Sequence, residues 1–315
     1  MLIVAGSPRK EKTIMPKSLN IGGQAVIEGV MMRSPHAFTV AVRHGGRPDA
    51  GIAVLKERIK PIGDRFPFFK KRVIRGAAAL FEALWLGIRA LNFSANEAFE
   101  SETGKKEEIG TLAMIGTLAV AVIFGLGLFL ALPLLLTSLL GTKVAALAES
   151  SVLFNLTDGV MRAALFLGYV SSISFMKDIR RVFEYHGAEH KAIAAWEAGE
   201  ELTIENVRLR PKIHPRCGTS FLLIVIALSI IMFSFIPGDW PVWAKGVSRL
   251  ALLPIIAGSA YEFIRYSAKR RGRPIVEALI LPGLWLQGLT TREPSDDQIE
   301  VAVRALKEAL AMEPR

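Results

Sequence analysis

The sequence Phe183-Glu-Tyr-His-Gly-Ala-Glu-His-Lys191 lies between two long apolar segments of the chain. In a helix, His186 and His190 stand on one face with roughly 6 Å between their Cβ atoms, so both imidazoles can bind one metal ion. Glu189 produces the order H-x-x-E-H, the reverse of the zinc-peptidase helix motif, and it can act as a ligand, a base or a partner of a ligand. This stretch therefore predicts a helix that carries half of a metal site.

A second stretch, His214-Pro-Arg-Cys-Gly218, supplies further ligand types. The two stretches together hold three of the five histidines and the only cysteine. We expect His214 and Cys217 to complete the coordination of a divalent ion, and zinc best fits nitrogen and sulfur donors. Two alternatives stay open, a structural zinc closed by four protein ligands and a set of histidines in ordinary surface or hydrogen-bonding roles. Gly187 counts against a rigid site, because glycine weakens a helix by about 1 kcal/mol relative to alanine.

The composition is typical of a membrane protein, since 51% of the 315 residues are hydrophobic. Four segments are long enough to cross roughly 30 Å of hydrocarbon: residues 109–131, 159–176, 219–236 and 247–263. We expect Pro133 to kink or end the first of these helices. The sequence predicts an α-helical polytopic membrane protein with about four transmembrane helices, further interfacial or re-entrant helices and a small N-terminal β-rich cytoplasmic module.

The distribution of lysine and arginine predicts the orientation. Basic residues are concentrated between the second and third segments and after the fourth: Lys177, Arg180, Arg181, Lys191, Arg208, Arg210, Lys212 and Arg216, then Arg265, Lys269, Arg270, Arg271 and Arg273. The two other loops carry little basic charge, so all basic regions share one side only if there are four crossings with both termini in the cytoplasm. We therefore predict a multi-pass protein of the cytoplasmic membrane.

The net charge of +10 fits the same bias together with attraction to anionic lipid headgroups, and no nucleic-acid motif accompanies it. The expected partners are the lipid bilayer, a lipid-linked or membrane-peptide substrate and a cytoplasmic protein, with no nucleic acid among them. The single cysteine excludes an intramolecular disulfide and fits a reducing compartment.

The chain divides into five parts by pattern. These are a disordered tail (1–18) without the features of a signal peptide, a β-rich cytoplasmic module with at least one hairpin (19–75), an amphipathic interfacial helix with a linker (76–108), a transmembrane domain that includes the cytoplasmic His/Glu/Cys loop 177–218 (109–290), and a C-terminal amphipathic helix (291–315). The helix of the third part could instead pack on the β module. A capping box at residues 295–298 opens the last helix.

Residues 273–288 are apolar but interrupted by Pro282 and Gly283, which favours a broken re-entrant or interfacial helix over a fifth crossing. Three acids outside the two motifs could join the metal site. Glu28 lies in an apolar run and either faces water from an edge strand or points at the site. Glu262 ends the fourth span, where Arg265 is its simplest partner, and Glu277 is similarly placed in the interrupted helix.

Three strings, Gly22-Gly-Gln-Ala-Val-Ile-Glu-Gly-Val-Met-Met-Arg33, Tyr185-His-Gly-Ala-Glu-His-Lys191 and His214-Pro-Arg-Cys-Gly-Thr-Ser220, resemble the hallmark stretches of the YqhQ-like bacterial membrane proteins. The resemblance runs from about residue 20 to the C-terminus, and three strings in order make it specific. It implies a polytopic protein of the bacterial inner membrane. Because the family has been described as a predicted metal-dependent enzyme, it also implies metal binding, but it supplies no substrate.

The expected function is that of a metal-dependent hydrolase acting at the cytoplasmic membrane face. His186 and His190 would hold the metal with His214 or Cys217, an open position would take water, and Glu189 would be the catalytic base. The alternative is a non-catalytic membrane scaffold or assembly factor with a structural metal or a hydrogen-bonded His/Cys cluster. A transporter that uses Glu262 and Glu277 is a third hypothesis, disfavoured by four spans with few charges at mid-membrane.

Overall fold

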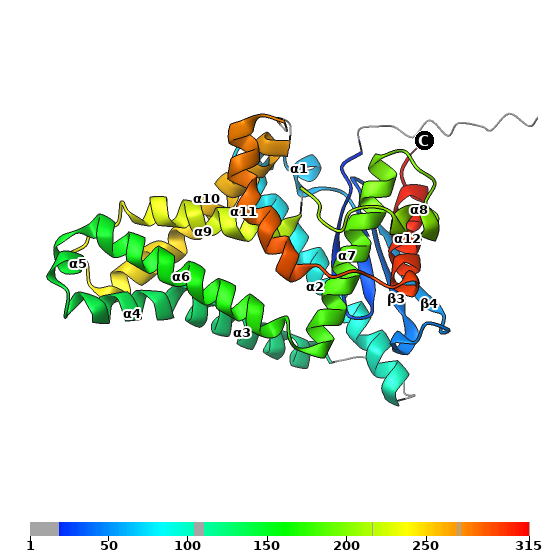
Figure 1. The fold of residues 1–315 in the computed structure, drawn as a ribbon, viewed down its shortest axis with the longest axis horizontal. Helices are drawn as coiled ribbons and strands as arrows, with labels where there is room; N and C mark the ends of the chain where they lie inside the picture. The colour runs from blue at the N-terminus through cyan, green and yellow to red at the C-terminus, as the bar shows by residue number, and fades with distance from the viewer. Residues whose placement is uncertain (1–18, 104–109, 216, 269, 271, 315) are drawn as a thin grey trace, which may run out of the picture.

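The structure, a computed structural model, describes residues 19–103, 110–215, 217–268, 270 and 272–314. The tail predicted for residues 1–18 and the linker 104–109 lie outside the described residues. A module containing a small sheet stands at one end of the molecule, and a long arm of helices extends from it (Figure 1). The mostly helical chain with an N-terminal sheet confirms that part of the predicted fold class.

The sheet is an antiparallel meander of four strands in sequence order: β1 (Gly22–Val26), β2 (Gly29–Arg33), β3 (Ala37–Arg43) and β4 (Ile52–Arg58). Val26 pairs with Gly29, so Ile27 and Glu28 form a two-residue turn in which Glu28 has a φ of 53°. Two-residue hairpin turns favour such left-handed conformations because they match the twist of the strands. A short 3₁₀ turn, His44–Gly46, connects β3 to β4.

Both faces of the sheet are covered, and β3 is buried at every residue. Val30, Met32 and Ala41 pack on one side against helices α7 (Lys177–Glu197) and α12 (Asp296–Ala311). On the other side, Phe38 and Val40 are among the strand residues that pack against helix α2 (Ile74–Thr103). The alternation of side chains along a strand separates these two sets, so the module has three layers (Figure 1).

Helix α2 follows two short elements, α1 (Ile62–Arg65) and a 3₁₀ turn at Pro67–Lys70. Leu86 and Ala90 on one face contact the sheet, whereas Phe81, Leu84 and Trp85 are exposed. The helix therefore packs on the β module, which was one of the two predicted alternatives. Its opposite, apolar face is left uncovered by the rest of the described chain.

Helix α12 begins at the predicted capping box, in which the side chains of Ser295 and Gln298 bond reciprocally to backbone N–H groups. Its C-terminal end is held by Glu313, whose carboxylate accepts hydrogen bonds from the Ser34 hydroxyl and the His36 N–H. Ala305 O accepts a 2.9 Å hydrogen bond from the buried Thr39 hydroxyl of β3. The last helix is thus a structural layer of the module.

The arm contains the apolar helices: α3 (Thr111–Leu126), a π-helical turn (Gly127–Ala131), α4 (Leu132–Gly141), α5 (Ala145–Glu149), α6 (Ser151–Ile173), α9 (Gly218–Phe233), α10 (Val242–Ala268) and α11 (Pro274–Thr290). Within the described residues, the continuous helix Leu112–Gly141 and the helix Val242–Ser267 are long and apolar enough to cross a membrane. Helix α6 joins α7 at a 99° bend and adds a third span if the pair is counted as one. Helices α9 and α11 are shorter apolar helices.

The expected break at Pro282 was wrong, and so was one of the two alternatives for Pro133, that the helix ends there. The first apolar helix does not end at Pro133 but continues to Gly141, with a π-helical turn immediately before the proline. Such a turn accommodates the hydrogen bond that proline cannot donate. Pro282 lies inside α11 without breaking it. Gly283 faces α9 there, where an added Cβ would lie 2.7 Å from the Ser220 side chain, so the glycine allows close helix packing.

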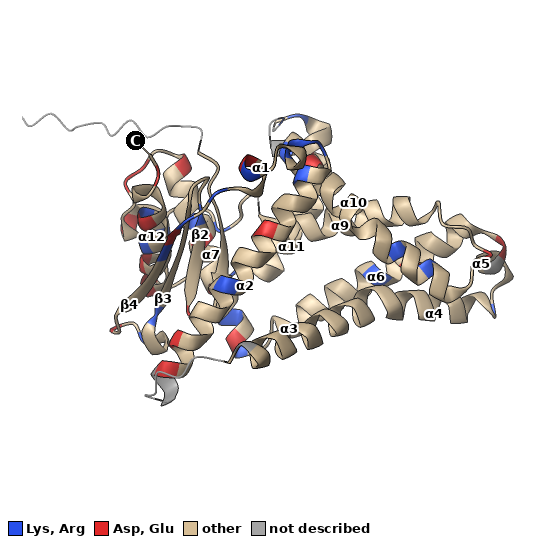
Figure 2. Ribbon diagram, turned by 180° about the vertical axis from the view of Figure 1, so that it is seen from behind, with Lys and Arg blue, Asp and Glu red and all other residues tan. Residues whose placement is uncertain are grey.

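A buried ionic group joins three helices inside the arm. Asp158 of α6 binds Arg162 of the same helix (2.6 Å) and Arg249 of α10 (2.8 Å). Arg249 also donates to Asn155 Oδ1 (2.9 Å), and Arg162 donates to the Ser229 hydroxyl of α9 (2.8 Å). Figure 2 shows basic positions within the arm where these helices run together. Charges in an apolar bundle need such partners, because an unpaired one is costly to bury.

The arm and the module meet where α2 crosses α10. A Cβ on Gly76 would lie 2.7 Å from Gly258 O, so both helices use glycine at the crossing. Glu262 forms an ion pair with Arg75 there, and not with Arg265 as expected from sequence spacing. The partner comes from a helix far away in the sequence, which a search for nearby residues cannot find.

Candidate metal centre

The His/Glu motif lies on α7, a 21-residue helix that runs across the sheet. His186 and His190 occupy one face, with 4.4 Å between their ring centroids. Gly187 stands where the backbone after α11 crosses the helix, and an added Cβ there would collide with Arg292 O. Arg292 N–H donates a 2.9 Å hydrogen bond to Phe183 O at this crossing. The glycine that weakens the helix locally is therefore required by tertiary packing.

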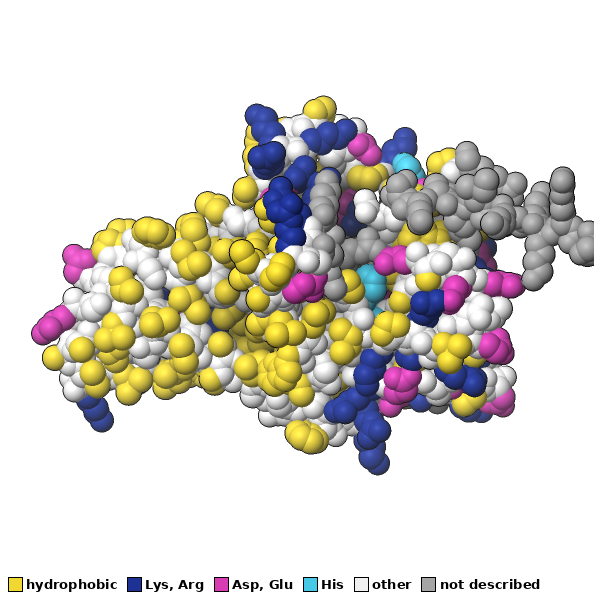
Figure 3. Space-filling view, turned by 45° about the horizontal axis from the view of Figure 1, so that its top comes forward, with side chains coloured by type: hydrophobic (Ala, Val, Ile, Leu, Met, Phe, Trp, Pro, Cys, Tyr) yellow, Lys and Arg dark blue, Asp and Glu magenta, His cyan; other side chains and the backbone are white. Residues whose placement is uncertain are grey.

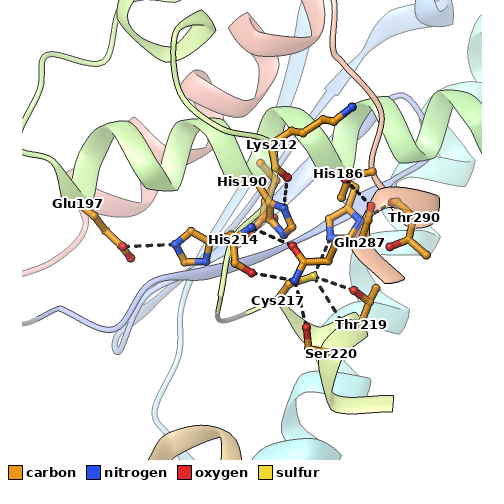
Figure 4. A network of polar contacts seen from close by, with 12 residues as sticks. His186, His190, Glu197, Lys212, His214, Cys217, Thr219, Ser220, Gln287 and Thr290 are labelled. Carbon is orange, nitrogen blue, oxygen red and sulfur yellow. Dashed lines mark hydrogen bonds and ion pairs between the residues drawn. The ribbon is translucent and has the colours of Figure 1, made fainter. Parts of the chain in front are cut away.

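Cys217 approaches the two histidines from the start of α9. It is the N-cap residue of that helix, and its sulfur accepts a hydrogen bond from Thr219 N–H at 3.4 Å. The sulfur lies 3.2 Å from His186 Nε2, and the ligand atoms of His186, His190 and Cys217 all lie within 4.8 Å of one another (Figure 4).

Both imidazoles are oriented by backbone carbonyls. His186 Nδ1 lies 2.8 Å from Thr290 O, and His190 Nδ1 lies 2.6 Å from Lys212 O. Because a carbonyl oxygen can only accept, each Nδ1 carries a proton, and Nε2 is the nitrogen that the neutral imidazole would offer to a metal ion. Metal-binding histidines usually have their second nitrogen held in this way.

The donor set fits a divalent ion such as zinc. In a tetrahedral site with Zn–N near 2.1 Å and Zn–S near 2.3 Å, neighbouring ligand atoms lie roughly 3.4–3.6 Å apart. The 3.2 Å separation of His186 Nε2 and Cys217 Sγ is close to that value, whereas ligand atoms of the group separated by up to 4.8 Å would have to move closer together around an ion. Burial lowers the pKa of His190, with the hydrogen bond to Cys217 acting in the opposite direction, so the neutral imidazole that binds metals is favoured.

Glu189 is 4% exposed and lies beside the cluster, with Oε2 3.5 Å from His190 Nε2. Its carboxyl group packs over Gly23 of β1 and accepts a hydrogen bond from the Gly23 N–H. Burial raises the pKa of Glu189, and the neighbouring His186 and His214 counteract part of that rise. A carboxyl with a raised pKa next to a metal site has the properties of a general acid or base.

His214 lies close to the cluster but is not part of the three-residue group. Its Nε2 is 3.3 Å from Glu197 Oε2, and its ring centroid is 5.8 Å from that of His190. Its backbone exchanges two 2.9 Å hydrogen bonds with the Gln287 side chain of α11. The structure thus brings together three of the four predicted ligands and holds the fourth against an acid.

The other acids considered from sequence have partners elsewhere. Glu28 binds Arg181 through both carboxylate oxygens and accepts a 3.2 Å hydrogen bond from Tyr185 OH, which ties the β1–β2 turn to α7. Glu277 accepts from Gly272 N–H at 2.9 Å in the turn before α11. With Glu262 bound to Arg75, none of the three belongs to the metal-type group found among the described residues.

The residues that support the site were not predicted from the sequence. Gln287, fully buried, links the His214 backbone to the Ser220 hydroxyl at 3.1 Å, and Thr290 orients His186. A buried amide in the otherwise apolar α11 was the one available signal, because polar groups in such a segment need partners. The role of Gly23 could not be recognised from sequence, since it depends on where α7 crosses β1.

The chain matches a known protein family. Residues 72–312 match a family described as "Protein of unknown function (DUF1385)". The chain is 36% identical over 307 residues to the "Uncharacterized protein YqhQ" of Bacillus subtilis (strain 168), which covers 93% of this chain and 92% of that protein. No solved structure matches the chain. The chain therefore belongs to the DUF1385 family of YqhQ-like proteins.

Proposed function

We propose that this protein is a metal-dependent hydrolase that works at the cytoplasmic face of the bacterial inner membrane. The observation that carries the proposal is the convergence of His186, His190 and Cys217, whose ligand atoms lie within 4.8 Å of one another while each Nδ1 is bound to a backbone carbonyl. Three protein ligands from two separate helices leave a position for water, as in catalytic zinc sites.

The chemistry divides between the ion and Glu189. A bound divalent ion supplies Lewis acidity and lowers the pKa of a coordinated water to about 7. Glu189 is the group that would take the proton, because its carboxyl is buried within 3.5 Å of His190 Nε2 and its pKa is raised by that burial. The carbonyls of Thr290 and Lys212 keep the two imidazoles in one tautomer throughout.

The test compares substituted proteins for metal content and for function in the cell. Glu189→Gln is expected to keep the metal and lose function, because an amide cannot accept the proton, and His190→Ala is expected to lose both. His36→Ala is the control, since His36 is exposed and pairs with Glu313. Element analysis of detergent-purified protein and complementation of a deletion strain give the two readings. A Glu189→Gln protein that is metal-loaded, stable and fully functional would rule out the general base.

The alternative function is a membrane scaffold or assembly factor with a structural metal. One observation favours it: His214 is buried, and its ring centroid lies 5.8 Å from that of His190. A change of rotamer would allow it to act as a fourth ligand. A closed site predicts that His214→Ala releases the metal, and that Glu189→Gln changes stability and function in parallel. Retention of the metal by His214→Ala supports the open, catalytic site.

We further propose four crossings, by α3–α4, α6, α9 and α10, with both termini in the cytoplasm. Support comes from the basic residues, which gather at the end of the arm next to the module, whereas the opposite end has few (Figure 2). Reporter fusions after Gly141 and Pro237 should be external, and those after Trp196 and Arg292 internal. An external fusion at Trp196 would contradict the topology and the cytoplasmic location of the metal centre together.

A further inference from the structure

A cavity of about 110 Å³ lies between α9, α10 and α11, directly beside the candidate metal centre. We call it the arm cavity and define it by its lining: Pro215, Ser220, Leu223, Ile224 and Ala227 from the α9 side, Ile264 and Ser267 from α10, and Leu279, Ile280, Pro282 and Gly283 from α11. Most of these side chains are apolar. Ala227, Leu279 and Pro282 are exposed, so the cavity is open along the side of the arm.

One end of the arm cavity is lined by Pro215 and Ser220, which flank Cys217 of the candidate metal centre. Ser220 stands in the first turn of α9, and its N–H donates to Cys217 O at 3.2 Å. The Ser220 hydroxyl accepts from Gln287, which also holds the His214 backbone. From Ser220 the lining continues to Ala227, about 10 Å farther along α9 at 1.5 Å per residue. The cavity therefore has a polar end at Ser220, next to Cys217, and an apolar end within the arm.

The polar end lies on the basic side of the molecule. Arg265, Arg270 and Arg273 are exposed at the end of α10 and the start of α11, and Ile264 and Ser267 of the lining belong to the same part of α10. Figure 3 shows lysine and arginine side chains gathered over this turn, next to the hydrophobic surface of the arm. This charge is complementary to an anionic headgroup.

The walls favour an acyl chain over a peptide. All three walls are helices, whose backbone groups bond internally, so they offer no free strand edge to which an extended peptide could add. A hydrocarbon chain needs no hydrogen bonds and gains about 0.8 kcal/mol for each methylene removed from water. The exposed side of the cavity would face lipid if the arm spans a membrane.

We propose that the arm cavity binds an acyl chain of an anionic phospholipid and holds the headgroup beside His186, His190 and Cys217. This inference rests on the proposed hydrolase and names its substrate class as a membrane phospholipid. The proposal concerns binding and orientation: the apolar end fixes the depth of the chain, the arginines select the headgroup charge, and Ser220 marks where the two regions meet.

The test uses the full-length protein in nanodiscs that contain phosphatidylglycerol with a photoactivatable diazirine in one acyl chain, and maps the labelled residues by mass spectrometry. Labelling is expected on the cavity-lining residues of α9 and α11. Ala227→Trp and Leu279→Trp fill the cavity and should each lower that labelling at least about tenfold, the equivalent of about two buried methylenes. Leu222→Trp is the matched control, because Leu222 is exposed on α9 outside the lining.

A second experiment tests whether the arginines select the charge of the headgroup. Arg273→Gln should lower labelling by phosphatidylglycerol about fivefold and leave labelling by phosphatidylcholine unchanged, since one basic side chain near an anionic surface contributes about that factor. Labelling spread evenly over the arm, or insensitive to Ala227→Trp and Leu279→Trp, would overturn the proposal. So would labelling of the cavity by a diazirine-bearing transmembrane peptide in preference to either lipid.

Metal analysis of the same samples separates this inference from the proposed function. A metal-loaded protein without cavity labelling overturns the lipid inference and leaves the hydrolase proposal standing. Cavity labelling in a wild-type protein that binds no divalent metal leaves the lipid site standing and overturns the hydrolase. Arg273→Gln alters an exposed side chain, so the comparison of the two lipids remains decisive if a tryptophan variant fails to fold.

Discussion

Replacing Gly23 by alanine tests the link between the N-terminal sheet and the candidate metal centre. An added Cβ would lie 2.6 Å from Glu189 Cγ, 2.7 Å from Glu189 Oε1 and 2.8 Å from Met31 O. The Met31 oxygen is backbone, and Glu189 is buried, so neither can move away freely. Gly22, the preceding residue, points to the other face of the strand, where a Cβ would meet nothing within 4 Å. Gly22→Ala is therefore a matched control in the same strand.

The two substitutions should change the free energy of unfolding in opposite directions. Alanine in a strand is favoured over glycine by roughly 0.5–1 kcal/mol, and Gly22→Ala should gain up to that amount. Gly23→Ala has the same gain but costs about 1–3 kcal/mol in overpacking. It costs about 1–3 kcal/mol more if Glu189 moves and leaves a buried hydrogen bond unmade. With both costs, the net expectation is a loss of about 1–5 kcal/mol.

The assay is thermal unfolding of detergent-purified protein, with metal content measured on the same preparations. At about 2–4 °C per kcal/mol, Gly23→Ala should lower Tm by roughly 2–20 °C, while Gly22→Ala should leave it unchanged or slightly raised. Loss of an outer partner of a metal site typically weakens metal binding about 10–100-fold, so Gly23→Ala should also release the proposed metal ion more readily. A Gly23→Ala protein as stable and as metal-loaded as Gly22→Ala would refute the placement of Glu189 over β1.

Three further predictions concern packing, charge and pH. Gly187→Ala should lower stability by about 1–3 kcal/mol despite the better helix propensity of alanine, because its Cβ would collide with Arg292 O, and thermal unfolding measures this. Asp158→Ala should cost about 3–5 kcal/mol by leaving two buried arginines unpaired, whereas Asp64→Ala, at an exposed ion pair, should cost no more than about 1 kcal/mol. Burial acts to raise the pKa of Glu313, but hydrogen bonds from the β2–β3 turn hold it below the ordinary value of 4.5. Its contribution to stability is therefore present above about pH 4.5 and lost as the pH falls through the folded-state pKa, and Glu313→Gln should abolish that part of the acid dependence in unfolding measured across pH 3–6.

Local patterns were sufficient for the features that depend on neighbouring residues. The capping box at Ser295 needs only residues three apart, and it forms as expected. The spacing of His186 and His190 depends only on the helical repeat, so the sequence could place both on one face of α7. The hydrophobic segments likewise indicated a helical membrane-type arm.

Features that depend on distant segments were decided by the tertiary structure. Sequence spacing assigned Glu262 to Arg265, whereas helix crossing pairs it with Arg75. Pro282 was expected to break a helix that in fact continues, because packing against α9 outweighs one lost backbone hydrogen bond.

The candidate site shows the same division. From the sequence alone, the ligand types and the pair on α7 could be named, since they follow from residue chemistry and the 3.6-residue repeat. Which atoms meet was decided by the fold: Cys217 reaches the pair from another helix, His214 is held by Glu197, and Glu189 packs on Gly23. These contacts join residues 17 to 166 positions apart, and their geometry is set by how α7, α9 and β1 pack, which no local pattern encodes.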